Sequence, residues 1–272
     1  MKSGMGAAPT GRRRRPPVLA AGLAVIAALF FVLPLAGLLW RAPWGSLAGD
    51  LAAPEVRTAL RLSLVTSLAA TAISFALGVP LAWVLARVAF PGRRLLRALT
   101  TLPMVLPPVV GGVALLFAFG RRGLLGQWLD AVFGIRLPFT TAGAVMAEAF
   151  VAMPFLVITT EAAFRTLDRR YEEAAVTLGA SRWTVFRRVT LPLAAPALAA
   201  GGVLCWARAL GEFGATITFA GNFPGTTQTM PLAVYLALES GRDSAIVLSL
   251  VLLAVSLFVL VALRDRWLGV AS

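Results

Sequence analysis

Long stretches of apolar residues constrain this sequence more than any other feature. The first runs from Val18 to Trp40 and contains no charged residue. At about 1.5 Å of rise per residue, a helix of this length crosses the roughly 30 Å hydrocarbon core of a bilayer. Hydrophobic residues make up 59% of the chain and charged residues only 14%, whereas soluble domains carry about 25% charged residues. The sequence therefore predicts an all-α integral membrane protein.

Six stretches of this kind predict six transmembrane helices. They lie at residues 18–40, 60–86, 98–120, 142–164, 196–220 and 244–263. The first is longer than the apolar core of a signal peptide, so we expect it to be retained. Residues 1–17 form a basic tail with Lys2 and the run Arg12–Arg15. We treat residues 18–272 as one transmembrane domain, in which a five-helix core at about 60–263 follows the first helix.

The distribution of arginine predicts the orientation. Segments rich in Lys and Arg stay on the cytoplasmic side of a membrane. The tail, the connection around Arg93, Arg94 and Arg97, and the connection at 165–188 are the most basic segments. With six spans they all fall on one side, so we expect both termini to be cytoplasmic. The connections at 41–56, 121–141 and 221–243 then face outward, and the pair Arg121–Arg122 is a local exception.

Several absences narrow the function. The chain has no His, which excludes His-based metal sites and His-based acid–base catalysis. Its single cysteine, Cys205, lies in an apolar run and predicts a packing residue. Lys2 is the only lysine, so the sequence has no phosphate-binding P-loop. We therefore expect no catalytic residue, metal site or cofactor in this chain, and any ATP and Mg²⁺ would be bound by a partner. Despite the net charge of +13, no basic stretch interleaved with aromatic residues indicates nucleic-acid binding.

One polar segment, residues 168–192, interrupts the apolar sequence. Asp168 is typical of a helix start, and Gly179 suits the left-handed position just past a helix end. Ser181 is placed to cap a second short helix that would end near Val189. Pro192 and Pro196 would then mark the entry into the next span. The segment is thus predicted to form two short cytoplasmic helices joined at a glycine.

The first of these helices has one apolar side. Tyr171, Ala174, Ala175 and Leu178 share a face at helical spacing, with Glu172 and Glu173 beside it. Such a face suits a docking surface for a partner protein, which small alanines let approach closely and acidic residues orient. It equally suits an amphipathic loop that rests on lipid headgroups, and the residues alone leave both interpretations open.

The spacing of this segment resembles a known family. Glu173-Ala174-Ala175, then Gly179, then Val189-Thr190-Leu191-Pro192 is similar to the EAA loop of binding-protein-dependent ABC importer permeases. The resemblance implies a type I importer permease fold, in which residues 173–178 dock on an ATPase subunit and Gly179 makes the turn. It also implies a pair of ATPase subunits, an outer oxyanion-binding protein and a second copy of this chain as partners in a bacterial inner membrane. The expected coupling residues are Glu172, Glu173, Ala174, Ala175, Leu178, Gly179, Leu191 and Pro192.

Two further stretches indicate the transported ion. Residues 102–123 and 210–231 are similar to permeases of the molybdate, tungstate and sulfate group. The run GEFGATITF followed by GNFPGTTQTMP most resembles molybdate permeases. Sulfate and tungstate remain alternatives. A secondary transporter that works without ATP is the alternative from another class, although such proteins often contain internal repeats and none is clear here.

Proline and glycine interrupt the third predicted span. Such residues kink or unwind helices, and irregular backbone within a membrane is tolerated where it is buried in protein or lines an aqueous path. A place on the translocation path is the favoured interpretation, and a simple packing kink is the alternative. The fifth span offers small and hydroxyl residues suited to weak contacts with an anion. The expected path residues are Pro107, Pro108, Gly111, Gly112, Gly211, Gly214, Thr216 and Thr218.

Charged residues inside the spans are few. Arg208 and Glu212 lie four residues apart and are predicted to form an ion pair, which lowers the penalty for burying either charge. Arg208 could contact the oxyanion, but we favour an internal lock, because Glu212 would repel an anion unless Arg208 already neutralised it. Glu148 and Glu161 lie in the fourth span with no assigned role.

Overall fold

The computed structural model describes residues 17–268, which divide into two compact units with the boundary between Ala42 and Pro43. Most of the predicted basic tail therefore lies outside the described residues. In the first unit, helix α1 (Val18–Trp40) coincides with the first predicted span. None of its residues is buried by protein, so its uniformly apolar surface is suited to lipid.

A pair of long helices forms the centre of the second unit. Helices α3 (Pro54–Arg87) and α7 (Thr141–Thr166) correspond to the second and fourth predicted spans, and α10 (Leu191–Leu210) packs against both. The α3 face that meets its neighbours is made of small residues, which let helix backbones approach closely. A Cβ atom on Gly78 would lie only 3.1 Å from Val157 Cγ2. The helix begins six residues before our prediction because Pro54 occupies its first turn, where proline is favoured.

The third predicted span is broken rather than kinked. It consists of α4 (Arg93–Thr101), the 3₁₀ turn η1 (Leu102–Met104) and α5 (Pro108–Phe119). The helix direction bends by 119° between the two arms. Pro107 adopts φ −53° and ψ 131° just before α5, and a proline also restricts the residue before it to extended geometry. Consecutive prolines thus end one helix and begin another.

The fifth predicted span differs from the structure at both ends. Helix α9 (Arg182–Val185), the π turn η2 (Phe186–Thr190) and α10 (Leu191–Leu210) form one continuous helix. The predicted break between the loop and this span is therefore wrong; the wide π turn ends just before Pro192 and makes room for its ring. The predicted continuation to residue 220 is also wrong, because α10 ends at Leu210 and a separate helix, α11 (Gly214–Phe219), follows.

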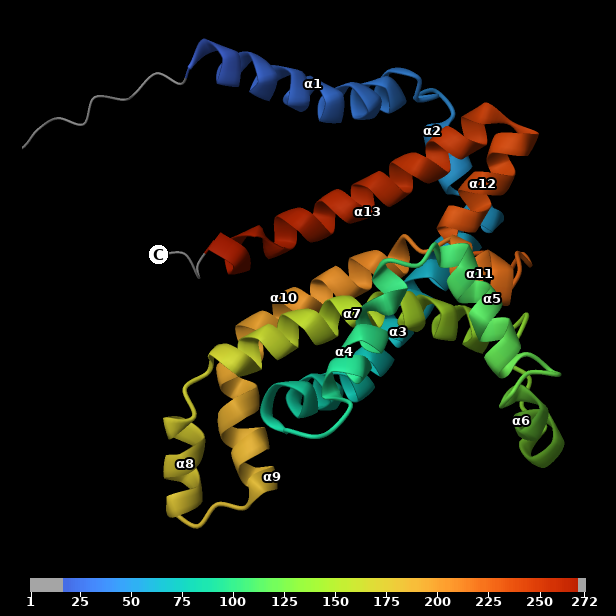
Figure 1. Ribbon diagram of the computed structural model, residues 1–272. Helices are drawn as coiled ribbons and strands as arrows, with labels where there is room; N and C mark the ends of the chain where they lie inside the picture. Colours follow the sequence, from blue (N-terminus) through green and yellow to red (C-terminus); the bar gives the residue numbers. More distant parts are fainter. Residues whose placement is uncertain (1–16, 269–272) are drawn as a thin grey trace, which may run out of the picture. The chain divides into compact units, whose positions relative to one another are not determined.

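The remaining helices complete the second unit. Short helices α2 (Leu47–Leu51) and α6 (Gly126–Phe133) were not predicted, nor was α12 (Met230–Ser240). Helix α13 (Arg242–Leu268) contains the sixth predicted span. The hairpin of α8 (Arg170–Thr177) and α9 extends from the ends of α7 and α10, and α6 lies beyond the other end of α7 (Figure 1).

Within the described residues, four helices are long and apolar enough to cross a membrane, or five if the bent pair counts as one span. The all-helical membrane architecture is thus confirmed. The count of six spans and the cytoplasmic position of both termini stay predictions.

Candidate functional site

Within the polar segment at 168–192, the turn at Gly179 and the helix start at Ser181 form as their residues predict, although the second helix continues into α10. Asp168 Oδ1 accepts a hydrogen bond from the Arg170 amide at 3.0 Å, and Ser181 Oγ accepts one from the Thr184 amide at 3.2 Å. Gly179 has φ +85°. The amides of Gly179 and Ala180 donate to the carbonyls of Val176 and Ala175, which is the Schellman arrangement for ending a helix. The turn at Gly179 is therefore built into the backbone.

Several side chains of α8 are largely exposed rather than packed against the rest of the chain. Tyr171 is 61% exposed, Val176 55% and Leu178 88%. Glu173 and Ala174 are exposed as well, while Ala175 is half-buried. A large apolar side chain such as Leu178 at the tip of a polar hairpin gains nothing from this exposure, so the face is suited to contact with another surface.

Glu172 points toward the helix bundle rather than toward solvent. Its Oε1 atom accepts hydrogen bonds from Arg87 Nη2 at 3.2 Å and from Thr190 Oγ1 at 2.9 Å. Arg87 also donates to the Leu167 carbonyl at 3.2 Å. Although we grouped Glu172 with Glu173 on the docking face, the structure therefore uses Glu172 to fasten α8 to the end of α3 and to η2. Only Glu173 remains exposed at that face.

The second arm of the hairpin is fastened by aromatic side chains. Phe186 contacts Trp83 of α3 edge-to-face and Trp183 at a tilt, with ring centroids 5.7 Å apart in both pairs. Val185 is buried beside them. Leu191 and Pro192 lie in the first turn of α10, away from the exposed face of α8. These two predicted coupling residues thus join the hairpin to the bundle.

Most of the predicted path residues lie in helix contacts within the chain. A Cβ atom on Gly112 would lie 2.6 Å from Thr218 Cβ and 2.9 Å from the Ala215 carbonyl oxygen. One on Gly214 would lie 3.0 Å from Pro108 Cβ. These glycines let α5 and α11 pack closely. Gly111 and Thr216 are also buried, Thr218 is half-buried, and Pro107 and Gly211 are exposed.

Arg208 and Glu212 form the predicted ion pair, with Arg208 Nη1 2.5 Å from Glu212 Oε2. Glu212 is almost fully buried, and its Oε1 atom accepts the Ala215 amide at 2.8 Å. Because Ala215 is in the first turn of α11, Glu212 caps that helix while it holds Arg208 of α10. The pair therefore lies across the break between the two helices.

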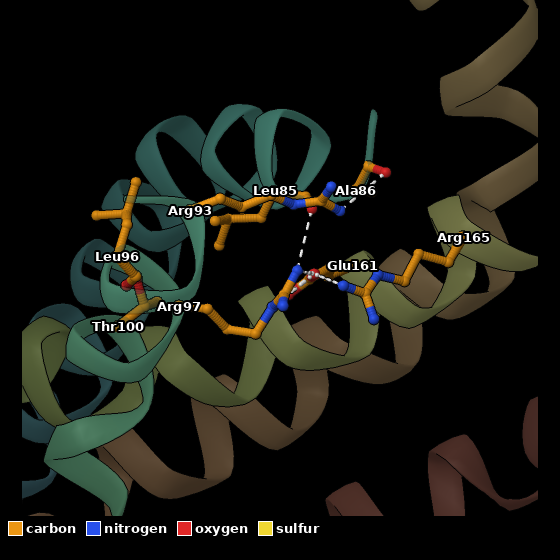
Figure 2. Close-up of polar contacts among 8 residues, drawn as sticks. All are labelled: Leu85, Ala86, Arg93, Leu96, Arg97, Thr100, Glu161 and Arg165. Carbon is orange, nitrogen blue, oxygen red and sulfur yellow. Dashed lines mark hydrogen bonds and ion pairs between the residues drawn. The ribbon is translucent and has the colours of Figure 1, made fainter. Parts of the chain in front are cut away.

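The two unassigned glutamates both connect helices. Glu148 is 1% exposed and accepts a hydrogen bond from Thr66 Oγ1 of α3 at 2.8 Å. Glu161 pairs with Arg97 of α4 and with Arg165 (Figure 2). No local pattern predicts the contacts of Glu148 with Thr66 and of Glu161 with Arg97, because these partners lie 82 and 64 residues apart along the chain.

The α6 region carries a polar cluster of its own. Asp130 accepts hydrogen bonds from Arg136 Nε at 2.9 Å and Arg121 Nε at 3.2 Å. The hydrogen bond from Arg136, together with the nearby charge of Arg121, holds the pKa of Asp130 below its usual range. Trp128 and Phe133 are mostly exposed beside it.

No group of three or more His, Cys, Asp or Glu side chains that could hold a metal ion is found among the described residues.

The chain combines long apolar helices, a broken span and a polar hairpin with exposed apolar side chains. This combination is typical of a membrane-embedded transport subunit. Residues 78–270 match the family described as the binding-protein-dependent transport system inner membrane component, and the chain belongs to that family. It is therefore an inner-membrane transport component rather than an enzyme.

Individual relatives cover most of the chain. The molybdenum transport system permease protein ModB of Mycobacterium tuberculosis is 47% identical over 243 residues, which are 89% of this chain and 92% of the relative. ModB of Escherichia coli is 43% identical over 216 residues, 79% of this chain and 94% of the relative. The sulfate transport system permease protein CysT of E. coli is 39% identical over 234 residues, 86% of this chain and 83% of the relative.

A solved structure shares the fold. A bacterial ABC transporter involved in the import of the acidic polysaccharide alginate matches with a TM-score of 0.73 and 20% identity, over 92% of this chain and 94% of that one. The chain thus has the fold of an ABC importer permease.

Proposed function

We propose that this chain forms the transmembrane pathway of a molybdate importer driven by ATP hydrolysis in a separate subunit. Relatives named as molybdenum permeases and the motif at 210–231 support molybdate as the ion. The observation that carries the proposal is the exposed face of α8, which is apolar at the tip of a hairpin otherwise fastened to the bundle by Glu172 and Phe186.

The exposed face of α8 docks on the ATPase subunit in this proposal. Leu178 and Tyr171 supply apolar contact area, and Glu173 supplies a charge that orients the partner. Glu172 makes the hairpin rigid, so movement of the ATPase reaches the bundle rather than being lost in a flexible loop. The ATPase binds the nucleotide and Mg²⁺, since this chain has no P-loop lysine.

Two copies of this chain line the pathway, and an outer binding protein delivers the ion to the connections at 41–56, 121–141 and 221–243. Within each copy, Arg208 serves as a lock between α10 and α11, because Glu212 already satisfies its charge. Because the charge of Arg208 is already satisfied, the pathway contacts the anion only weakly, and weak contact suits a pathway that must release the ion. Both termini lie in the cytoplasm.

Uptake competition tests the substrate. The complete complex, with its ATPase and binding protein, is placed in membrane vesicles and supplied with labelled molybdate and ATP. Excess unlabelled molybdate should abolish the labelled uptake, and sulfate should leave most of it in place. Stronger inhibition by sulfate than by molybdate would make the chain a sulfate permease. Uptake that persists in membranes lacking the ATPase would overturn the ABC assignment.

A further inference from the structure

Helix α4 is poorly held by apolar contacts. None of its residues is buried. Leu95 is 64% exposed and Leu99 54%, so the leucines face away from the protein. A helix of nine residues is too short to be stable by itself. Something other than an apolar core must therefore set the position of α4 against the bundle.

A charged contact performs this task. Arg97 of α4 faces Glu161 of α7 with Nε 3.0 Å and Nη2 2.7 Å from Oε1, and with Nε 3.3 Å from Oε2 (Figure 2). The Nη2 atom also donates to the Leu85 carbonyl of α3 at 3.2 Å. One guanidinium group thus joins three helices, and its rigid planar donors fix direction as well as distance.

Glu161 itself is enclosed, with 6% of its surface exposed. Arg165 also pairs with its Oε1 atom at 2.9 Å. Arg165 lies on the same helix as Glu161, one turn further along, so this second pair joins no two helices. The structure therefore contains two arginines on one carboxylate, of which only Arg97 connects α4 to the bundle.

The last turn of α3 forms polar contacts with both α4 and α8. The carbonyls of Leu85 and Ala86 accept hydrogen bonds from Arg97 and Arg93 of α4. The next residue, Arg87, binds Glu172 of α8. Residues 85–87 therefore form a short rigid connection between the hairpin and the first arm of the broken span. The second arm, α5, packs mainly against α11 and to a smaller extent against α7.

We propose that the Arg97–Glu161 contact transmits movement of α8 to the break at Leu102–Pro107, with Glu161 as a positioning residue for transport. This proposal depends on the docking role of α8 proposed above. When the ATPase moves α8, the end of α3 moves with it through Arg87, and α4 follows because Arg97 holds it to α3 and α7. Since α5 is held by α11, the angle between α4 and α5 changes and the pathway opens or closes.

The first test compares Glu161→Gln with Arg165→Gln in the complete complex with its loaded binding protein. Glutamine keeps the shape of Glu161 but removes the charge that holds Arg97. We expect ATP hydrolysis to continue while molybdate transported per ATP falls roughly tenfold, a typical size for a coupling residue. Arg165→Gln, which removes only the pair within α7, should stay within about twofold of the unchanged protein. Normal coupling in Glu161→Gln would overturn the proposal.

Arg97→Lys provides a second variant in case Glu161→Gln fails to assemble with the ATPase. Lysine keeps a positive charge near Glu161 but lacks the forked donors that reach the Leu85 carbonyl as well. Coupling weaker than in Arg165→Gln supports the proposal, and coupling equal to that of the unchanged protein contradicts it.

A spin label measures the movement of α4 directly. The label is attached to Leu99→Cys, and the native Cys205 is fully buried and does not compete for it. Binding of a non-hydrolysable ATP analogue should change the spectrum in the parent complex and in Arg165→Gln, but not in Glu161→Gln. A response that survives in Glu161→Gln rejects the proposed contact. No coupled uptake in the parent complex would instead reject the proposed function, so the two failures are distinguishable.

Discussion

Adjacent residues in α8 have opposite environments. Glu172 is fastened by Arg87 and Thr190, whereas Glu173 is exposed on the outer face. One residue step along a helix turns a side chain by about 100°, which is enough to move a carboxylate from the bundle to the partner side. Two glutamates that look equivalent in the sequence therefore have different contacts.

Glu173→Ala should weaken docking of the ATPase without harming the fold. Truncation of a residue that carries part of the binding energy of an interface costs more than about 1 kcal/mol, so we expect ATP-coupled uptake to fall roughly fivefold or more. The measurement is uptake per assembled complex in vesicles. Glu172→Gln is the matched comparison, since it should lower the thermal stability of the purified chain by removing an internal contact. Equal effects of the two variants on stability would contradict the proposal that Glu172 holds the fold while Glu173 contacts the partner.

Asp130 predicts a pH dependence in the α6 region. Its pKa is lowered in the folded protein by Arg136 and Arg121. The stabilisation is therefore complete above the ordinary Asp pKa of about 3.9 and is lost as pH falls through the lower folded value. Hydrogen exchange at residues 121–136 should be slow at neutral pH and faster under strongly acidic conditions. Asp130→Asn should exchange faster at neutral pH and respond less to acid; a response like that of the unchanged protein would disprove the role of this carboxylate.

At the scale of elements, breaks in helices position the functional parts. The 119° bend between the arms of the third span and the interruption after Leu210 produce two short helices, α5 and α11, that pack on each other. Glycines at this crossing replace side chains that would hold the helices apart. Gly112, which we predicted to line the path, is buried in this contact.

Gly112→Ala should push α5 from α11, because the new Cβ atom would lie 2.9 Å from the Ala215 carbonyl oxygen, which belongs to the backbone and cannot rotate away. Overpacking of this kind typically destabilises by about 1–3 kcal/mol. Thermal unfolding of the detergent-purified complex measures the loss. Gly211→Ala is the control, since its nearest neighbour would be the Ala207 carbonyl oxygen at 3.6 Å. A loss in Gly211→Ala as large as in Gly112→Ala would show that the crossing is not the cause.

At the scale of the molecule, the two units differ in how much they depend on packing. Helix α1 buries none of its residues, whereas α3, α7 and α10 in the second unit share an extensive core. The match to the permease family, residues 78–270, lies wholly within the second unit. The second unit therefore contains the parts needed for a permease fold.

Removal of residues 1–42 should leave the second unit folded and able to bind the ATPase. The physical reason is that none of the α1 residues is buried, and that Ala42 is the single buried residue among residues 17–42. Copurification of the shortened chain with the ATPase, and its thermal stability beside that of the full chain, measure the outcome. Failure of the shortened chain to copurify while it remains in the membrane would show that the first unit takes part in assembly.

Local properties of the sequence determined the helical membrane architecture and the geometry of the polar hairpin. Apolar length sets what enters a bilayer, and the cap at Ser181 and the left-handed turn at Gly179 depend only on neighbouring residues. Proline positions likewise predicted an interruption in the third span, although not a sharp break. Only the tertiary structure decided which charges meet. Arg97 and Glu161 are 64 residues apart, and Arg87 and Glu172 are 85 apart. Such contacts depend on how helices are arranged, which no local pattern specifies, and they place Glu161 and Glu172 between helices that are far apart in the sequence.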